Sequence, residues 1–321
     1  IFTQGNGYIG IRNSLEEHYV GEIRDTFITG TFNKASEDEV SELPNIADMS
    51  AVKIIIDGTE FSLTEGEITF YERSLDLSTG ESLRNIVWKS QSGVRVELSF
   101  RRFVSLYNEH LFVQKVDLLC DRDVDIIIES GIDGSVTNSG AMHFEDIKRR
   151  VYEGKYMEYI SRTTQSKVSV VQDAVCRLNK EAAVIPVMGR RTLANKYSLK
   201  LKANEKLEFE KRSVFFSTRD KELTVFLEDE RLEEAKKRAL KLIIDIENTE
   251  YSELFKSSES VWKEYLKKSE IIVGTDDEYV KTAINFALYH LRIMVKADDN
   301  RVGIGAKALS GEGYKGHSFW D

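Results

Sequence analysis

The sequence predicts a mainly β protein: a large antiparallel β-sandwich followed by helices. From residue 1 to about residue 226, short apolar stretches alternate with polar residues and are separated by polar turns, with no helical period between them. This pattern is typical of a sandwich. The period changes near residue 229, where apolar residues begin to recur every three or four positions. We therefore expect a sandwich domain over residues 1–226, a two-helix linker over 227–269, and the start of another, incomplete domain over 270–321.

The strand predictions depend on alternation and on turn residues. Residues 94–100 place apolar side chains at every second position, which is the period of a half-buried strand. An apolar run at residues 52–56 leads into Asp57-Gly58, a strong hairpin signal. The same alternation flanks a polar turn at residues 203–206. Consecutive strands joined in this way should pair as antiparallel hairpins.

Two amphipathic helices are expected to form the linker. The first carries its apolar stripe from Leu232 to Ile246, and the second carries a similar stripe from Leu254 to Leu266. Trp262 lies on the second stripe and is predicted to be a core residue.

A third helix is expected over residues 276–295. Thr275 and Glu278 fit a capping box, in which each side chain satisfies the other residue's backbone N–H. The apolar residues of this helix cover far more than one narrow stripe, so most of its surface needs cover. We therefore expect the domain that begins near residue 270 to be cut off in this chain.

Composition and charge exclude several classes of protein. The chain has 321 residues and a net charge of −9, which argues against a dedicated nucleic-acid binder. No apolar run approaches the length of a membrane span, and no leader segment is visible. Cys120 and Cys176 match no metal-ligand spacing and are expected to be reduced and buried, which favours the cytoplasm. The histidines are scattered and form no metal triad, so neither a metal nor a cofactor is predicted.

Two segments match the glycine-rich pattern G-x-G-x-x-G, at residues 5–10 and 311–316. A dinucleotide site would also need a preceding strand, a following helix and a parallel βαβ unit, and neither segment has this context. We favour the simpler interpretation, in which the glycines allow tight turns with positive φ.

The residues best suited to a binding site lie in the glycine-rich stretch from Gly303 to Asp321. An aromatic ring can stack on the apolar face of a sugar while a carboxylate accepts hydrogen bonds from two hydroxyls, and Trp320 with Asp321 offers this pair. The alternative is structural, with Trp320 in a core and Asp321 capping a helix. From the residues alone, both interpretations stay open.

The two ends of the chain resemble a known family. The segment ALSGEGYKGHSFWD, residues 308–321, is similar to the entry into the catalytic barrel of the disaccharide phosphorylases of glycoside hydrolase family 65. The segment FTQGNGYIGIRNSLEE, residues 2–17, resembles the N-terminal signature of the same family. Shorter similarities between them occur in the expected order.

This resemblance implies a fold, a reaction and a set of site residues. The fold would be a β-sandwich, a helical linker and an (α/α)6 barrel, of which only the first helix is present here. Trp320 and Asp321 would bind the glucosyl unit of the substrate, with His317 and Phe319 in supporting positions. The reaction would be phosphorolysis of an α-linked glucosyl disaccharide with inversion, with inorganic phosphate as co-substrate and β-glucose 1-phosphate as a product. The general-acid Glu would lie downstream, so this chain alone would be inactive.

Two other functions remain open at this stage. A related α-glucoside hydrolase of the trehalase type would share every motif seen here and would differ in a second, downstream carboxylate that acts as base. The isolated chain could instead be a non-catalytic carbohydrate-binding or assembly module. The expected partners are a disaccharide and phosphate, with no nucleic acid and no membrane. Family members tend to form homodimers, so a homodimer is possible here, but the sequence leaves the oligomeric state open.

Overall fold

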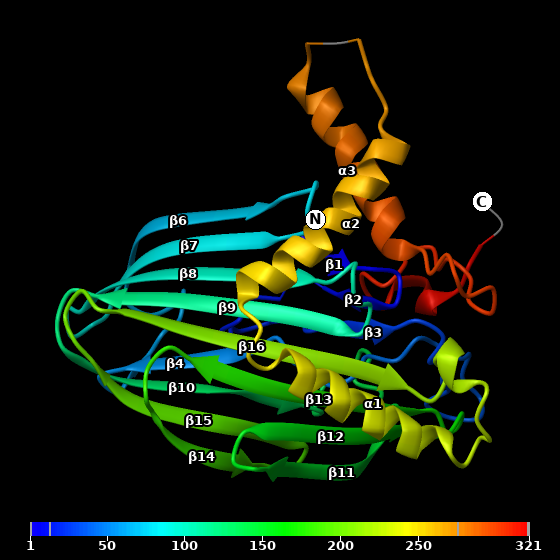
Figure 1. Cartoon of the computed structure of the whole chain (residues 1–321), viewed down its shortest axis with the longest axis horizontal. Coiled ribbons are helices and arrows are strands. Elements are labelled where there is room, and N and C mark those ends of the chain that lie inside the picture. Colours follow the sequence, from blue (N-terminus) through cyan, green and yellow to red (C-terminus); the bar gives the residue numbers. More distant parts are fainter. Residues whose placement is uncertain (1, 13, 275, 320–321) are drawn as a thin grey trace.

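The computed structural model of the chain describes residues 2–12, 14–274 and 276–319. Over these residues the protein is mainly β, with three antiparallel sheets and three α-helices (Figure 1). The strands are β1 (Gln4–Gly5), β2 (Ile9–Ile11), β3 (Thr26–Ile28), β4 (Val52–Ile56), β5 (Thr59–Glu60), β6 (Glu67–Leu75), β7 (Ser82–Lys89), β8 (Arg95–Val104), β9 (Leu111–Cys120), β10 (Val124–Asp133), β11 (Phe144–Tyr152), β12 (Tyr156–Thr163), β13 (Ser169–Leu178), β14 (Ala183–Met188), β15 (Thr192–Leu201) and β16 (Lys206–Ser217). The helices are α1 (Arg231–Ile246), α2 (Tyr251–Ser269) and α3 (Glu278–Met294), with short 3-10 turns η1 (Lys221–Leu223) and η2 (Gly313–Gly316).

The two larger sheets pack face to face and enclose the main core. One has five strands in the order β14-β15-β10-β4-β5, and the other has eight in the order β11-β12-β13-β16-β9-β8-β7-β6. Ile54 and Ile126 from the five-stranded sheet lie in one buried cluster with Trp88, Leu98 and Phe209 from the eight-stranded sheet. The small sheet β1-β2-β3 contributes to a second core cluster. The predicted mainly β fold is confirmed.

The predicted turns also form. Asp57 and Gly58 join β4 to β5 with φ of 46° and 78°, the left-handed conformation that a two-residue hairpin turn needs. The turn between β15 and β16 contains Asn204 with φ of 57°. Local turn chemistry therefore places these strands next to each other in the sheets.

One buried lysine connects the two sheets. Lys211 in β16 donates to the carbonyl oxygens of Met49 (2.6 Å) and Gly131 (2.5 Å) and to the hydroxyl of Ser130 (3.2 Å). Burial lowers the pKa of Lys211 to about 8. The ammonium group is thus held between the sheets by neutral acceptors.

The helices cover only part of the sandwich. The small side chains of Ala235 and Ala239 and the buried Ile243 place α1 on β13 and β16. Trp262 in α2 is 1 % exposed, which confirms its predicted core position. Figure 1 shows α2 and α3 extending beyond the β6 side of the sandwich. None of the helices in the described part of the chain combines the length and apolarity that a membrane crossing requires.

Two local predictions need correction. Helix α3 begins at Glu278, and its cap is Asp277, whose carboxylate accepts from the backbone N–H of Tyr279 (2.9 Å). Thr275, the other half of the predicted capping box, lies outside the described residues. Both cysteines are free, but only Cys120 is buried. Cys176 is half-buried because β13 is only partly covered over its last three residues.

Candidate functional site

Helix α3 is anchored to both α2 and the N-terminal strand. The ring of Tyr289 stacks on Trp262 with 5.2 Å between centroids and an interplanar angle of 11°. The hydroxyl of Tyr289, which is fully buried, donates to the carbonyl oxygen of Thr3 at 3.0 Å. These contacts fix the point from which the chain continues into the candidate site.

The chain after α3 lies directly on the first glycine motif. A Cβ on Gly7 would be 2.1 Å from the carbonyl oxygen of Val295, and one on Gly10 would be 2.1 Å from the Cβ of Leu309. Only Gly7 of this motif has a positive φ, at 90°. The prediction that the glycines serve tight turns is therefore right for Gly7 and wrong for Gly10, because at Gly10 close approach of Leu309 excludes any side chain.

Ion pairs and hydrogen bonds fasten the same connection. Lys296 forms an ion pair with Glu109 at 2.5 Å, and its side chain is 7 % exposed. Lys221 donates to the carbonyl oxygen of Asp298. Arg301 donates to the carbonyl oxygen of Arg219 at 2.9 Å. All three bonds come from charged donors, and such bonds are stronger than bonds between neutral groups. Residues 296–301 are therefore held against the sandwich.

The stretch that carries the predicted site residues is also bound to sandwich loops. His317 donates from Nε2 to the carbonyl oxygen of Ser41 at 2.6 Å, so Nε2 carries a proton. The backbone N–H of Leu43 donates to the carbonyl oxygen of Lys315 at 3.0 Å. The carboxylate of Glu312 accepts from both the backbone N–H and the hydroxyl of Ser139. The loops at residues 41–43 and 139 thus hold this stretch from two sides.

Two consecutive residues of this stretch adopt a left-handed backbone. Tyr314 has φ of 59° and Lys315 has φ of 55°. For residues other than glycine this conformation costs about 1–2 kcal/mol each. Strain of this kind persists when surrounding contacts enforce it, and it is frequent at functional sites. It turns the ring of Tyr314 edge-on to Phe319, with 5.1 Å between centroids, and both side chains are more than half exposed.

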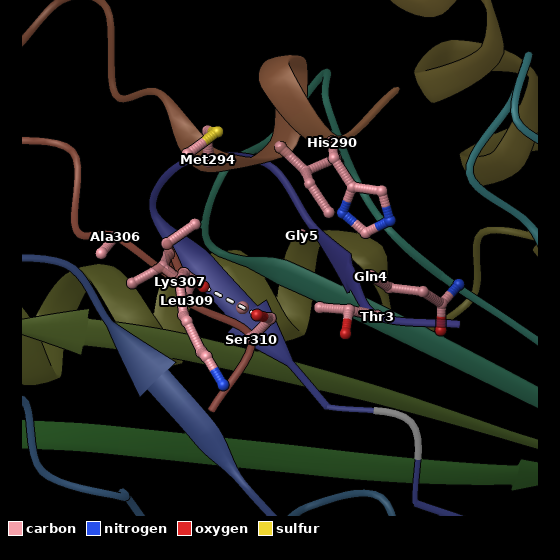
Figure 2. A pocket seen from close by; sticks show the side chains of 12 residues that line it. Thr3, Gln4, Gly5, His290, Met294, Ala306, Lys307, Leu309 and Ser310 are labelled. Carbon is pink, nitrogen blue, oxygen red and sulfur yellow. Dashed lines mark hydrogen bonds between the residues drawn. The ribbon is translucent and has the colours of Figure 1, made fainter. Parts of the chain in front are cut away.

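A cavity of about 290 Å³ lies where β1, the end of α3 and residues 306–310 meet (Figure 2). Gly5 and Gly10 form part of its wall, and His290 and Leu309 lie on opposite sides of it in the view. This cavity lies next to the contact between Leu309 and Gly10.

A second polar cluster lies beneath residues 296–301. His110 donates from Nδ1 to the carbonyl oxygen of Phe215 (2.7 Å) and from Nε2 to Glu222 (3.0 Å). Because both ring nitrogens face acceptors, both carry a proton and the ring is an imidazolium. Burial opposes this charge, but the bond to Glu222 raises the pKa of His110. Despite burial, the bond from His110 holds the pKa of Glu222 at about 2. Burial raises the pKa of the neighbouring Asp220, which accepts from the hydroxyl of Tyr8 at 2.7 Å, to about 7.

This cluster contains the group of side chains closest to a metal-ligand arrangement. Donor atoms of Glu109, His110 and Glu222 lie within 4.8 Å of one another. Each is already engaged, however: His110 with Glu222, and Glu109 with the ammonium of Lys296. We interpret the group as an ion-pair cluster. Glu109 and His110 are adjacent in the sequence, but Glu222 lies 112 positions after His110, so no spacing pattern could have revealed the group.

The predicted site residues divide into two pairs. His317 is half-buried and bonded to Ser41, and its ring lies 5.3 Å from that of Phe32, whereas Phe319 is 54 % exposed beside Tyr314. Trp320 and Asp321 lie outside the described residues. Sequence reasoning did not single out Tyr314 or the loop at residues 41–43. The sequence signal for Tyr314 was its place between Gly313 and Gly316 of the second motif.

The fold of this chain is similar to that of a solved structure. A solved structure from the human microbiome, described provisionally as a kojibiose phosphorylase, superposes with a TM-score of 0.87 at 21 % identity. The alignment covers all of this chain and 42 % of that protein.

Sequence comparison identifies the family. The family model of the glycosyl hydrolase family 65 N-terminal domain matches residues 1–265, and the model of the family's central catalytic domain matches residues 285–321. The chain belongs to glycosyl hydrolase family 65.

Curated relatives agree along the whole chain. The kojibiose phosphorylase of Halothermothrix orenii is 37 % identical over 331 residues, covering all of this chain and 41 % of the relative. The nigerose phosphorylase of Lachnoclostridium phytofermentans is 28 % identical over 344 residues, covering all of this chain and 44 % of the relative. The chain therefore spans less than half the length of these relatives.

Proposed function

We propose that the full-length protein containing this chain is an inverting glycoside phosphorylase. It would cleave an α-linked glucosyl disaccharide with inorganic phosphate to give β-glucose 1-phosphate and glucose. The observation that carries the proposal is the similarity, over the entire chain, to relatives named as kojibiose and nigerose phosphorylases. Because those two names differ in the disaccharide, the linkage used by this protein is left open.

Within this chain, Trp320 and Asp321 would bind the glucosyl unit. The indole would stack on the sugar face, and the carboxylate would accept hydrogen bonds from two hydroxyls. The fixed position of His317 on Ser41 supports this role, since it holds the residues just before them. Phe319 would support Trp320 from the exposed aromatic pair that it forms with Tyr314.

The chemistry would need one protein acid. A phosphate oxygen attacks the anomeric carbon from the face opposite the glycosidic oxygen, the bond between that carbon and the glycosidic oxygen breaks, and the leaving oxygen takes a proton from a Glu. Inverting hydrolases need a second carboxylate to activate water. Phosphate is already an anionic nucleophile, so no base is required. The Glu and the phosphate-binding groups would belong to parts of the protein beyond residue 321, and this chain alone would be inactive.

We also propose the domain division 1–226, 227–269 and 270–321, with α3 as the first helix of an (α/α)6 barrel. The central catalytic domain match, which begins at residue 285 within α3, supports it. A groove of about 830 Å³ between α2, α3 and the turn after β6 is lined by apolar residues such as Ile271, Ile284 and Leu288. The remainder of the barrel would cover this surface.

Inorganic phosphate would be the only co-substrate, with no cofactor. The two free thiols fit a reducing compartment, and we include the cytoplasm in the proposal.

The test is phosphorolysis by the full-length protein. Maltose, trehalose, kojibiose and nigerose are each incubated with and without phosphate, and β-glucose 1-phosphate is measured. Product that requires phosphate on at least one disaccharide is expected. Glucose release undiminished without phosphate would instead indicate a hydrolase, and inactivity on all four would contradict the proposal.

The 321-residue chain, assayed in parallel, should release no product. Calorimetric titration of the same chain with glucose checks whether it is a binding module; we expect no micromolar binding.

A further inference from the structure

The outer face of the eight-stranded sheet carries a groove that the proposed function does not use. The groove has a volume of about 490 Å³ and is lined by residues of β6, β7, β8, β9 and β16. This volume lies in the range of small-molecule sites, roughly 300–1,000 Å³. The five strands are neighbours joined by backbone ladders, so the groove is preformed and does not depend on a loop.

A row of polar side chains crosses the groove. Asn85 in β7 lies opposite Ser99 in β8, and Ser99 lies opposite Asp117 in β9. The residues next to these positions, such as Ile86 and Leu98, are buried in the core between the sheets. Because side chains alternate along a strand, the polar row points outward. Among the described residues, the amide of Asn85 and the hydroxyl of Ser99 have no hydrogen-bond partner, so both are available to a ligand.

A β-bulge turns an aromatic ring to the same face. The register of β6 shifts between Ile68 and Phe70, so that Phe70 pairs with Val87 and not with the buried Ile86. Regular pairing would have directed Phe70 toward the core. With the bulge its side chain lies on the outer face and is 48 % exposed. Bulges re-aim side chains in this way and are frequent next to functional sites.

The charged groups around the groove are already paired. Asp117 accepts a hydrogen bond from Arg101 at 2.9 Å and forms an ion pair with Lys206 at 3.2 Å. Glu97 forms an ion pair with Arg95 at 2.7 Å. The groups left for a ligand are therefore a neutral amide and a neutral hydroxyl beside an aromatic ring. This set suits a neutral, hydroxyl-rich ligand better than an anion.

From the groove, the exposed ring and the available polar groups, we propose that this face binds an α-glucosyl oligosaccharide. A sugar ring has an apolar C–H face and a rim of hydroxyls. One glucosyl unit places its apolar face on Phe70, and its hydroxyls exchange hydrogen bonds with Asn85 and Ser99. The α-linkage rests on the proposed function, whereas the choice of a neutral sugar rests on the groove itself.

This site is separate from the candidate active site. The groove shares no residue with the cavity beside Leu309 or with residues 303–319. Helix α1 packs on β13 and β16, and Tyr251 of α2 packs on Phe103 near the end of β8, so the helices cover other parts of the sheet (Figure 1). With one ring and few hydrogen bonds, the groove should bind with a dissociation constant of about 1 mM.

The first experiment is native gel electrophoresis of the full-length protein in gels with and without soluble starch. Starch should retard wild type and also Phe70→Tyr, which keeps an aromatic ring, whereas Phe70→Ala should migrate as it does without starch. Tyr107→Ala is the matched control, since Tyr107 is 71 % exposed and lies outside the groove; starch should retard it like wild type. Wild type that is not retarded, or Phe70→Ala retarded as strongly as wild type, would overturn the proposal.

The variant Asp321→Asn separates this site from the candidate active site. It weakens the proposed glucosyl site, yet starch should retard it as strongly as wild type. Loss of retardation in Asp321→Asn would place the binding at the candidate active site and overturn the groove. A full-length protein that is inactive in phosphorolysis but retarded through Phe70 would contradict the proposed function and support the groove.

The second experiment tests the polar row by isothermal titration calorimetry of the full-length protein with maltoheptaose, without phosphate. Asn85→Ala and Ser99→Ala should each raise the dissociation constant by about fivefold, the effect expected from one lost hydrogen bond. Gln165→Ala, at an exposed amide outside the groove, is the control and should bind like wild type. Unchanged dissociation constants for both groove variants would exclude this mode of binding.

Discussion

Gly10 lies directly against Leu309, and a Cβ on Gly10 would be 2.1 Å from the Cβ of Leu309. Leu309 in turn packs with Phe27 and Leu43 in a small buried cluster. The segment that carries the candidate sugar-binding residues therefore packs against the first glycine motif. This relationship joins the two ends of the chain, and it leads to the first prediction.

Gly10→Ala should destabilise the full-length protein by about 1–3 kcal/mol, because the added methyl overlaps Leu309 and neither backbone can easily move away. Gly274→Ala is the matched control, since a Cβ there meets no atom of the described residues within 4 Å; its effect should stay within about 0.5 kcal/mol. Urea unfolding gives both values. An unchanged midpoint for Gly10→Ala would show that the two ends are not packed in this way in solution.

His317→Phe should lower kcat/KM for the disaccharide by about fivefold, since it removes one hydrogen bond, to Ser41, worth about 1 kcal/mol. His317→Gln keeps an N–H donor and should lose less. His18→Gln, at an exposed histidine, is the control and should behave as wild type. If His317→Phe and His317→Gln prove equally impaired, the hydrogen bond to Ser41 is not the reason.

Asp321→Asn should lower kcat/KM on the order of 10- to 150-fold. The variant keeps the shape of the side chain but loses the charge that strengthens hydrogen bonds from sugar hydroxyls, a loss worth about 1.5–3 kcal/mol. Steady-state phosphorolysis by the full-length protein gives the ratio. Asp276→Asn, at an exposed acidic residue before α3, is the control. Activity within twofold of wild type would remove Asp321 from the site.

Asp173→Asn should make the protein more stable at pH 8. Asp173 is fully buried, and neither carboxylate oxygen has a hydrogen-bond partner among the described residues. Burial raises the pKa of Asp173 well above its ordinary value. The negative charge of the neighbouring Glu158 adds to this shift, and the positive charge of Arg150 opposes it. The folded state therefore binds more protons than the unfolded state above pH 4, so this residue makes stability fall as pH rises.

The Asp173 effect can be followed by thermal unfolding between pH 5 and pH 8. The difference in melting temperature between Asp173→Asn and wild type should widen toward pH 8. Asp125→Asn, at an exposed carboxylate in β10, should show no such trend. A constant difference at every pH would mean that Asp173 is ionised throughout.

Lys211 should make the stability of the protein rise with pH, opposite to the effect of Asp173 and in a higher pH range. Its pKa falls to about 8 on burial, below the ordinary value of 10.5, so the unfolded state binds more protons between these values. This contribution makes stability rise from pH 8 to pH 10, by at most about 1.4 kcal/mol per pH unit. Lys211→Met should abolish the rise, which urea unfolding across this range measures. The exposed Lys202 offers a control, since Lys202→Met should leave the rise in place.

Much of the scaffold followed from local sequence. The alternation at residues 94–100 became part of β8, Asp57-Gly58 became a left-handed turn, and Trp262 on its helical stripe became core. These outcomes depend on φ/ψ preferences and on one buried face per element, which neighbouring residues are enough to determine. The cap of α3 was assigned wrongly because several polar residues precede the helix, and which of them caps it depends on the path of the incoming chain.

The sequence by itself determined the mainly β fold, the amphipathic helices and the position along the chain of the segment proposed to bind sugar. Tertiary structure decided what those segments contact. His317 and Ser41 are 276 residues apart, yet they share a 2.6 Å hydrogen bond. Glu109 and Lys296 are 187 residues apart, yet they form an ion pair. Such contacts follow from the pairing order of sixteen strands, and that order is set by long-range packing rather than by any local period.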